Sequence, residues 1–469
     1  MKILTVDVGS TYTKLTAIDG EKRQILGTSQ AFTTIETDVM QGFQEAFARL
    51  TEDRESNLCA GFNYDELLVC SSAAGGLKMV ALGLVPDLTA KAARTAASNA
   101  GAKVVKTFAY EISGSEQQEI YDINPDLVLL CGGTDGGNKE VIIANAKHLV
   151  AIDRPFTTIV AGNKSANDDI KAIFDEAGKD VVITANVMPQ FNKLNIEPAR
   201  DAIRQLFISR IIEAKGLNIL QSMTSYKIIP TPLAVLHACE LLSKGTKTQQ
   251  GRGDLLAVDI GGATTDVYSM ASGEPTVDNT MLKGLPEPWM KRTVEGDLGM
   301  RYSLTHVYEQ IPGSDNPENE YMQQVKAWVE LCTARPDTLA APGSEEEKLE
   351  EFLGRSAVSM AVERHCGRIA DVYTPLGLMH TQEGKDLMNV PSVIGIGGVL
   401  RNSRRPEEIL KGSLYDFMHP ECTKPRKPKF YLDQKYIFLS IGLLRSINPE
   451  LAFELLDKET VEIGCNATV

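Results

Sequence analysis

The sequence lacks the patterns that mark several common protein classes. It contains no G-x-x-x-x-G-K-[ST] phosphate loop, and no apolar run of about 18 residues, the length at which a membrane-spanning helix is suspected. Its eight cysteines include no C-x-x-C pair, and its six histidines show no metal-binding spacing. We therefore expect no membrane span and no zinc site, and we expect reduced thiols in a cytoplasmic protein.

The chain also has fewer positively than negatively charged side chains. The chain has 48 Lys and Arg against 62 Asp and Glu, a net charge of -14. A protein that binds nucleic acid needs a basic surface, so we expect no nucleic-acid partner. The N-terminus enters an apolar strand that contains Asp7 after a single lysine, which predicts no signal peptide. At 469 residues, the chain is too long for one core and should form two or more domains.

One stretch, LLAVDIGGATTDV at residues 255–267, predicts a β-hairpin that binds phosphate. An apolar strand ends in Asp259, two glycines allow a tight turn, and Asp266 leads into a second strand. Backbone N–H groups in such a turn can hold phosphate oxygens. The two acids need a cation between them and the phosphates, and Mg²⁺ is the usual one. The expected phosphate-binding residues are Gly261, Gly262, Ala263 and Thr264.

A second stretch, LTVDVGSTYTK at residues 4–14, repeats the order of apolar run, aspartate, glycine and hydroxyls. Its acid is Asp7, which we expect to share the metal with the acid of the first stretch. Lys14 lies one step beyond the turn and is either a further nucleotide ligand or a structural residue. Two related hairpins about half a chain apart predict two related half-domains that clamp one nucleotide. The expected phosphate-binding residues here are Gly9, Ser10 and Thr11.

Two further stretches fit a nucleotide site. Residues 393–400, VIGIGGVL, predict a short strand whose glycines allow a flat ring or a ribose to approach the backbone. These glycines are Gly395, Gly397 and Gly398. Residues 230–242, PTPLAVLHACELL, predict a proline-started helix rich in small residues, which suits close packing at a hinge.

The segments between these motifs are less specific. Residues 60–190 alternate strands and helices, which predicts βαβ units and a parallel sheet. The GGTDGG run at 132–137 either lines a second ligand site at the edge of that sheet or is a plain turn. Residues 287–301 form either a solvated loop or a loop that brings Lys291 or Arg292 to phosphates.

Together these motifs resemble the actin, sugar-kinase and heat-shock ATPase superfamily. The helix at 230–242 followed by the hairpin at 255–267 is similar to the connecting helix and second phosphate motif of its chaperone branch. Over nearly the whole chain, the closer resemblance is to the accessory-protein family of adenosylcobalamin-dependent glutamate (methylaspartate) mutase, often labelled GlmL or MutL. The stretches that carry it are VDVGSTYTKLTAID, CSSAAGGLKMVALGLVP, LCGGTDGGNKE, KRTVEGDLGMR and VIGIGGVLR.

The superfamily resemblance implies an α/β, two-lobed actin-like ATPase fold, built from duplicated ribonuclease-H-like domains with inserted subdomains. The first lobe would span 1–243, with the first hairpin, an inserted α/β region around 60–190 and the hinge helix 230–242. The second would span 244–469, with the second hairpin, a largely helical insertion around 303–390, the adenosine strand 393–400 and a final hinge helix 435–445.

The same resemblance implies a function. The chain would bind ATP and Mg²⁺ and reactivate an adenosylcobalamin-dependent mutase as a chaperone, coupling ATP binding and hydrolysis to a conformational change. Asp7 and Asp259 would orient metal-bound water, and Asp266 would be either a second acid near the metal or a buried anchor. The alternatives are a small-molecule kinase of the same superfamily, which needs an acceptor pocket and a catalytic carboxylate, and an actin-like filament former.

Overall fold

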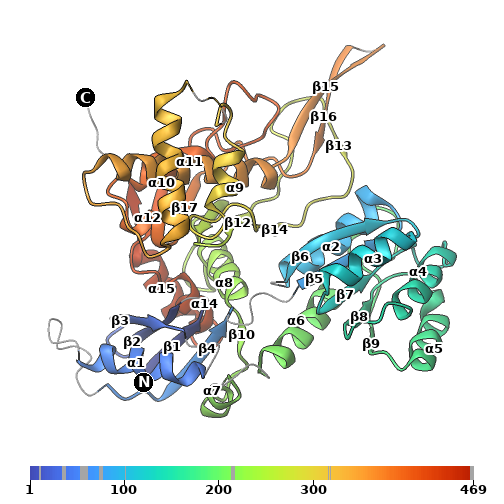
Figure 1. The fold of residues 1–469 in the computed structure, drawn as a ribbon, viewed down its shortest axis with the longest axis horizontal. Coiled ribbons are helices and arrows are strands. Elements are labelled where there is room, and N and C mark those ends of the chain that lie inside the picture. Colours follow the sequence, from blue (N-terminus) through green and yellow to red (C-terminus); the bar gives the residue numbers. More distant parts are fainter. Residues whose placement is uncertain are drawn as a thin grey trace. The chain divides into compact units, whose positions relative to one another are not determined.

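The computed structural model describes residues 1–9, 12–33, 38–52, 62–72, 78–100, 102–212, 217–314, 316, 318–375 and 377–464 (Figure 1). The chain divides into two compact units. The first unit comprises Met1–Val235 and Gly284–Pro286, and the second comprises Leu236–Lys283 and Glu287–Val469. The division therefore falls inside helix α8 (Thr231–Lys244). No helix in the described part of the chain is long and apolar enough to cross a membrane.

The first sheet of the first unit is a meander of three antiparallel strands extended by two parallel ones. In spatial order its strands are β10 (Ile229–Pro230), β4 (Glu66–Ser71), β1 (Lys2–Val8), β2 (Tyr12–Asp19) and β3 (Gln24–Phe32). Helix α1 (Val39–Glu52) packs on β2 and β3 through a buried face at helical spacing that includes Phe43 and Leu50. The short helix α7 (Leu217–Met223) precedes β10 in the chain.

The second sheet of the first unit is entirely parallel, as the alternation of strands and helices predicts. Its order is β6 (Lys103–Ala109), β5 (Lys78–Gly83), β7 (Leu127–Leu130), β8 (Thr157–Val160) and β9 (Val181–Ile183). The helices associated with it are η1 (Pro86–Ala90), α2 (Lys91–Asn99), α3 (Gly114–Ile123), α4 (Glu140–Val150), η2 (Lys164–Ala166), α5 (Asn167–Ala177) and α6 (Glu197–Ile212). Both faces are buried, because alternate residues of β5 and β7 enter two different hydrophobic clusters.

The main sheet of the second unit repeats the strand order of the first sheet. It runs β14 (Met290–Glu295), β12 (Thr265–Met270), β11 (Leu255–Ile260), β17 (Ser392–Ile396), β18 (Lys429–Asp433) and β19 (Thr460–Ile463). The first three strands pair antiparallel, whereas β17 and β18 continue parallel to β11. This order matches β3-β2-β1-β4-β10, and β19 is an added antiparallel edge strand. The repeated topology confirms the α/β fold class with a duplicated ribonuclease-H-like sheet.

The rest of the second unit is helical around this sheet, apart from one projecting sheet. Its helices are α8, α9 (Leu304–Glu309), α10 (Glu320–Ala334), α11 (Glu345–His365), α12 (Gly398–Asn402), α13 (Pro406–Leu410), η3 (Lys411–Ser413), α14 (Phe438–Leu444) and α15 (Pro449–Glu459). Helix α14 is shorter at both ends than the helix predicted at 435–445. It begins where Asp433 accepts hydrogen bonds from the backbone N–H groups of Ile437 and Phe438.

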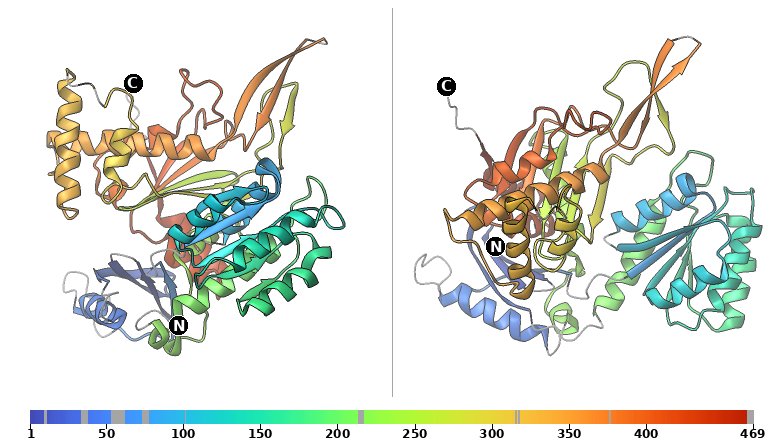
Figure 2. Two further views of the ribbon diagram at one scale, coloured as in Figure 1. Left: turned by 45° about the vertical axis from the view of Figure 1, so that its right-hand side comes forward. Right: turned by 45° about the horizontal axis from the view of Figure 1, so that its top comes forward.

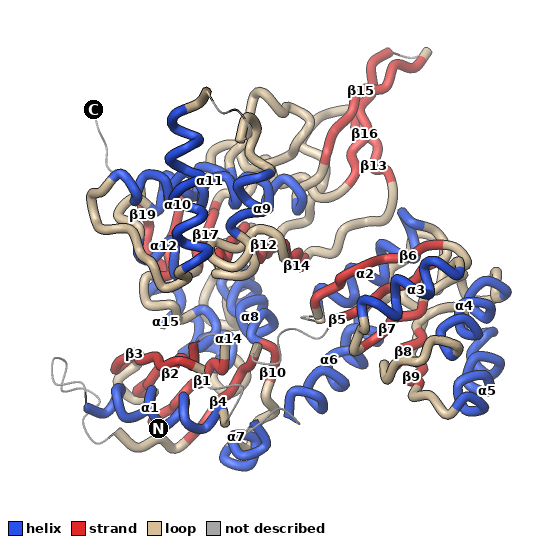
Figure 3. The backbone as a smooth tube through the Cα atoms, in the orientation of Figure 1, coloured by secondary structure: helices blue, strands red, loops and turns tan. Residues whose placement is uncertain are grey.

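The segment 303–390 differs from the largely helical insertion that the sequence predicts. Helices α9, α10 and α11 follow one another, and α11 ends at His365. A β-hairpin comes next, formed by β15 (Arg368–Thr374) and β16 (Gly377–Glu383). Strand β13 (Thr280–Lys283) pairs with β16 and completes a three-stranded sheet, distinguished from the helices in Figure 3. This hairpin extends away from the rest of the second unit in both views of Figure 2. This sheet depends on the pairing of β16 with a strand distant in the sequence, and local helix propensity gives no information about such pairing.

Candidate functional site

The hairpin of β1 and β2 places Asp7 opposite Lys14 in the strand register. The backbone N–H of Gly9 donates to the carbonyl of Tyr12 at 3.1 Å and closes the turn. A Cβ atom at position 9 would lie 2.6 Å from that carbonyl oxygen, so only glycine fits this approach. The predicted phosphate ligands Ser10 and Thr11 lie outside the described residues.

The Asp7 carboxylate is almost completely buried, with 2% of the residue exposed. Its Oδ1 accepts a hydrogen bond from the Thr231 hydroxyl at 2.6 Å, and the Cys70 thiol lies 3.5 Å from the same oxygen. The ammonium group of Lys14 lies 4.0 Å from Oδ2. Burial raises the pKa of Asp7, while Lys14, Thr231 and Cys70 act in the opposite direction. The site therefore combines one buried acid with three groups that favour its ionised form.

The hairpin of β11 and β12 places Asp259 opposite Asp266. The backbone N–H of Gly261 donates to the carbonyl of Thr264 at 2.9 Å and closes the turn. Residues 300–302 contact this turn through backbone hydrogen bonds. The backbone N–H groups of Met300, Arg301 and Tyr302 donate to the carbonyls of Gly261 and Gly262 over 2.8–3.0 Å. These bonds satisfy the carbonyls of the turn and hold it in one conformation.

The two hairpins share one arrangement. In each, an aspartate is the penultimate residue of the central strand, at Asp7 in β1 and at Asp259 in β11. A glycine follows two residues later, and its N–H closes a turn on the carbonyl three residues further along. Each hairpin thus offers one carboxylate beside a tight turn. The equivalence arises because both central strands occupy the same position in equivalent sheets.

Asp266 is held by an arginine. Arg292 donates from Nε to Asp266 Oδ1 at 2.8 Å, and its second nitrogen lies 2.6 Å from the same oxygen. The hydroxyl of Thr264 donates to Oδ2 of Asp266 at 3.3 Å. Arg292 is 5% exposed, so this is a buried ion pair. Both carboxylate oxygens of Asp266 are therefore engaged by groups of the protein itself.

The predicted loop at 287–301 is wrong for its central part, which is strand β14 paired with β12. Arg292 points into the interior and pairs with Asp266 instead of meeting phosphates. Lys291 is committed too, because it donates to the carbonyl of His365 at 2.8 Å and pairs with Glu287 at 3.1 Å. The sequence suggested a loop here because its charged cluster is broken by Gly296 and Gly299, but charged residues also suit an edge strand such as β14.

The three glycines predicted to face adenosine have different surroundings. Strand β17 lies beside β11, with Ile396 opposite Asp259. The predicted strand over 393–400 is wrong beyond Ile396, because Gly397, at φ 111°, breaks the strand and Gly398 begins helix α12. A Cβ atom at Gly397 would lie 2.3 Å from the carbonyl oxygen of Ile260, so this glycine allows close contact between two strands.

Gly395 faces the hydrophobic core, where an added Cβ atom would lie 2.9 Å from Leu400 and 3.1 Å from Leu410. Gly398 has no such neighbour, since nothing in the described structure lies within 4 Å of an added Cβ atom. Of the three glycines, only Gly398 therefore borders open space that a flat ring could occupy.

The glycine-rich loop after β7 is held by two buried amide side chains. The side chain of Asn163 accepts from the backbone N–H of Gly136 at 3.1 Å and donates to the carbonyl of Gly137 at 3.0 Å. Asn186 donates to the carbonyl of Gly133 and to Asp135, both at 3.0 Å. These contacts fix the loop through side chains of the protein itself.

The acidic residues present suit only one mode of Mg²⁺ binding. Within the described residues, no three His, Cys, Asp or Glu side chains gather as a metal site. Mg²⁺ in nucleotide sites keeps several waters and binds through one or two carboxylates together with phosphate oxygens. Asp7 and Asp259 each provide one carboxylate beside a tight turn, so a metal held chiefly by water and phosphate suits them.

Sequence reasoning missed Thr231, which contacts Asp7 from a position 224 residues later in the chain. The available signal was the Pro230–Thr231–Pro232 run, in which a hydroxyl is fixed between two prolines at the start of a helix. The sequence was interpreted there as a hinge helix only.

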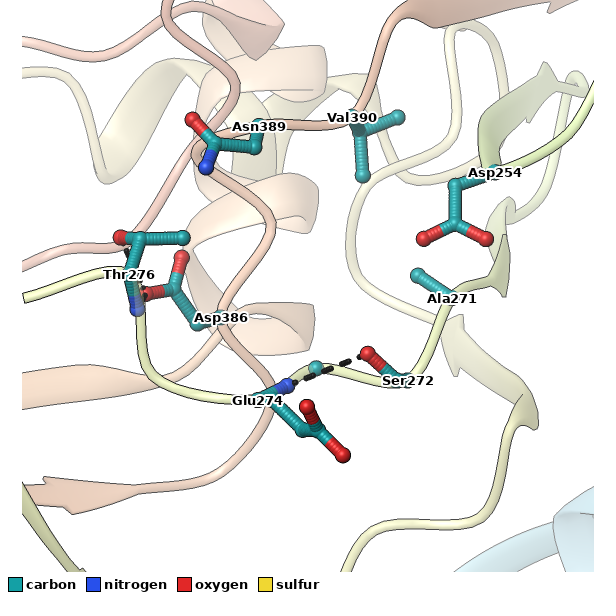
Figure 4. A pocket seen from close by; sticks show the side chains of 9 residues that line it. Asp254, Ala271, Ser272, Glu274, Thr276, Asp386, Asn389 and Val390 are labelled. Atoms are coloured by element: carbon teal, nitrogen blue, oxygen red, sulfur yellow. Dashed lines mark hydrogen bonds between the residues drawn. The ribbon is translucent and has the colours of Figure 1, made fainter.

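A polar pocket of about 210 Å³ lies elsewhere in the second unit (Figure 4). Its lining includes Asp254, Ser272, Glu274, Thr276, Asp386 and Asn389, and it contains none of the predicted site residues. The Asp386 carboxylate already accepts from the N–H and hydroxyl of Thr276 at 2.9 and 2.7 Å. The pocket therefore includes no residue of the 261–264 turn, although Asp254 and Ala271 flank the strands of that hairpin.

Comparison with known proteins gives one strong match. The family model described as MutL protein matches residues 3–460. The chain is similar to Protein MutL of Clostridium tetanomorphum, with 47% identity over 463 residues that cover 98% of this chain and 99% of the relative.

Similarity to solved structures is much weaker. Gluconate kinase from Lactobacillus acidophilus is 11% identical with a TM-score of 0.33, covering 98% of this chain and 92% of that one. The ethanolamine utilization protein EutJ from Carboxydothermus hydrogenoformans is 9% identical with a TM-score of 0.24, covering 97% and 90%. Similarities at this level identify no function.

Proposed function

The chain belongs to the MutL protein family, which the sequence resemblance identifies as accessory proteins of glutamate mutase, and from this we propose that it is an ATP-binding chaperone that reactivates such a mutase. The observation that carries the nucleotide part of the proposal is the repeated hairpin, with Asp7 and Asp259 at equivalent positions before equivalent turns. Family membership carries the choice of partner, an adenosylcobalamin-dependent mutase.

In this proposal the turns at 9–11 and 261–264 bind the phosphates of ATP through backbone N–H groups and hydroxyls. The N–H groups of Gly9 and Gly261 are not among them, because they close the turns. Mg²⁺, when bound, neutralises charge on the phosphates. Asp7 and Asp259 hold and orient its water ligands. Lys14 balances the charge of Asp7 at 4.0 Å.

The remaining predicted residues take different roles. Gly398 borders the adenosine, since it alone of the three late glycines has open space beside it. Gly395 and Gly397 serve the packing of β17 against its neighbours. Of the two roles expected for Asp266, a second acid near the metal or a buried anchor, it takes the second, because Arg292 and Thr264 occupy its oxygens.

The chaperone part requires that ATP and ADP favour different states of the protein. A nucleotide shifts such an equilibrium only by its differential affinity for the two states. A coupling of about 1–3 kcal/mol, typical of allosteric proteins, changes the affinity for a partner by 5- to 150-fold. ATP hydrolysis would then convert the state that binds the mutase into the state that releases it.

The decisive experiment is isothermal titration of the full chain with Mg·ATP and Mg·ADP, comparing the wild type with Asp259→Ala. We expect binding in the wild type and a loss of at least about tenfold in the variant, because the charge that faces the metal is removed. Asp254→Ala is the matched control, since Asp254 precedes the same strand but lines the separate pocket. Wild-type protein that binds neither nucleotide would overturn the proposal.

The partner is tested with purified glutamate mutase. We expect Mg·ATP to change both the co-purification of mutase with this protein and the turnover of mutase that carries damaged cofactor. If the protein binds nucleotide but shows neither effect on the mutase, the nucleotide-binding part of the proposal stands and the chaperone part is rejected. A small-molecule kinase is indicated instead if an acceptor lowers phosphate release while ATP is still consumed.

A further inference from the structure

Asp7 is the acid of the first unit that we propose faces the metal, and its shortest polar contact is with Thr231. The Thr231 hydroxyl lies 2.6 Å from Oδ1, compared with 3.5 Å for the Cys70 thiol and 4.0 Å from Oδ2 to Lys14. A buried carboxylate is costly unless it accepts hydrogen bonds. A hydroxyl has one proton to donate, and here that proton goes to Asp7.

The fold places this hydroxyl with little freedom. Strands β1, β4 and β10 lie side by side, so that Asp7, Cys70 and Ile229 occupy one row of the sheet. Pro230 ends β10, and Thr231 begins helix α8 two residues beyond that row. Pro232 follows within the first turn of the helix, where its missing N–H costs nothing. Two prolines therefore fix the backbone on both sides of the threonine.

The hydroxyl bond leaves the two oxygens of Asp7 unequal. Thr231 and Cys70 both contact Oδ1, whereas Oδ2 faces the more distant Lys14. A charge-assisted hydrogen bond of this length restricts the rotation of the carboxylate about its last torsion. Oδ2 is therefore the oxygen held in position for a water ligand of a nucleotide-bound cation.

We propose that Thr231 is a positioning residue for Mg·ATP, which holds the Asp7 carboxylate in one orientation and does not itself contact the nucleotide. This inference rests on the proposed function, because it assumes that Asp7 faces the metal. It adds a link from the site to α8, the helix within which the division between the two units falls. A change at Asp7 would reach that helix through a single hydrogen bond.

The test measures Mg·ATP affinity in Thr231→Val, Thr231→Ser and Thr5→Val. Valine keeps the shape of threonine and removes the hydroxyl, so we expect Mg·ATP binding to weaken about tenfold or more. Serine restores the hydroxyl and should bind within about threefold of the wild type. Thr5, buried on the same strand β1 with its hydroxyl 3.4 Å from the carbonyl of Thr16, is the matched control and should bind like the wild type.

The second measurement repeats each titration with ATP in the presence of EDTA. Positioning of Asp7 affects only metal-dependent binding, so all variants should bind metal-free ATP alike. Equal weakening with and without Mg²⁺ in Thr231→Val would mean a structural role and overturn the inference, as would wild-type affinity in that variant. Thr231→Ala replaces the valine variant, with the same expectations, if valine prevents folding.

The outcomes separate this inference from the function on which it rests. If the wild type fails to bind Mg·ATP, both are overturned. If the wild type binds, Asp259→Ala loses binding and Thr231→Val does not, the proposed function stands and only the role of Thr231 falls.

Discussion

At the scale of single residues, the ion pair between Asp266 and Arg292 decides between the two roles that the sequence allowed for Asp266. The carboxylate accepts two contacts from the guanidinium, at 2.8 and 2.6 Å, inside a nearly closed environment. Removing one partner of such a pair leaves an uncompensated buried charge. The stability of the protein, more than its nucleotide affinity, should depend on this acid.

We predict that Asp266→Ala lowers the free energy of unfolding of the second unit by about 3–5 kcal/mol, because Arg292 is left buried without its anion. Urea unfolding measures this effect. In Asp266→Ala with Arg292→Met, most of the loss should be recovered, since both charges are gone. A variant that keeps its stability and instead loses Mg·ATP binding would show that Asp266 serves the metal.

Lys385 is a second buried charge of the second unit. It is fully buried, and its ammonium donates to the carbonyl of Trp289 at 2.7 Å and to the hydroxyl of Ser269 at 3.2 Å. Burial, together with the nearby charge of Lys291, lowers the pKa of Lys385 to about 7, while Glu287 and Asp254 act against this shift. The folded protein therefore holds this proton less tightly than the unfolded chain does.

This difference predicts a pH-dependent stability. Between pH of about 7 and the unfolded pKa of about 10.4, the unfolded state binds more protons, so stability rises with pH by up to about 1.4 kcal/mol per pH unit. Unfolding in urea from pH 7 to 9.5 measures the slope. Lys385→Met should flatten it, since a group of similar length without charge takes its place. An unchanged slope in that variant would assign the pH dependence to other groups.

At the scale of elements, the junction of β17 and α12 shows two adjacent glycines with opposite requirements. Gly397 has φ 111° and lies against the backbone of Ile260, whereas Gly398 begins the helix beside open space. The first position forbids a side chain on grounds of packing and backbone conformation. The second has room for one.

We predict that Gly397→Ala lowers the free energy of unfolding by at least about 1–3 kcal/mol, because the backbone must leave a conformation that alanine rarely adopts. Gly398→Ala should change stability by less than about 0.5 kcal/mol. Thermal or urea unfolding compares the two. If adenosine lies beside Gly398, that variant should weaken ATP binding while it remains stable, and unchanged binding would place the adenosine elsewhere.

At the scale of the whole molecule, the chain contains the same sheet twice, once in each unit, with different additions. The first unit adds the parallel sheet of β5 to β9, and the second adds the helices α9 to α11 and the projecting sheet of β13, β15 and β16. Each unit has the buried clusters that a compact unit needs. The duplication explains why two short sequence motifs, half a chain apart, have the same local geometry.

The sequence alone determined what depends on local pattern. An apolar run, an aspartate and a glycine two residues later define each hairpin, because strand alternation and turn chemistry involve only neighbours in the chain. Motif order over nearly all residues then identified the family, and alternation of strands and helices predicted a parallel sheet. Strand ends were less predictable, as at Ile396, where a glycine both ends a strand and precedes a helix.

Only the tertiary structure decided which side chains meet across long separations. The hydroxyl of Thr231 reaches Asp7 over 224 positions, and Arg292 pairs with Asp266 because β14 lies beside β12. The exposure of Gly398 and the burial of Gly395 likewise depend on which elements pack beside them. Sheet register and packing bring these groups together, and neither is encoded in any stretch short enough to be interpreted by itself.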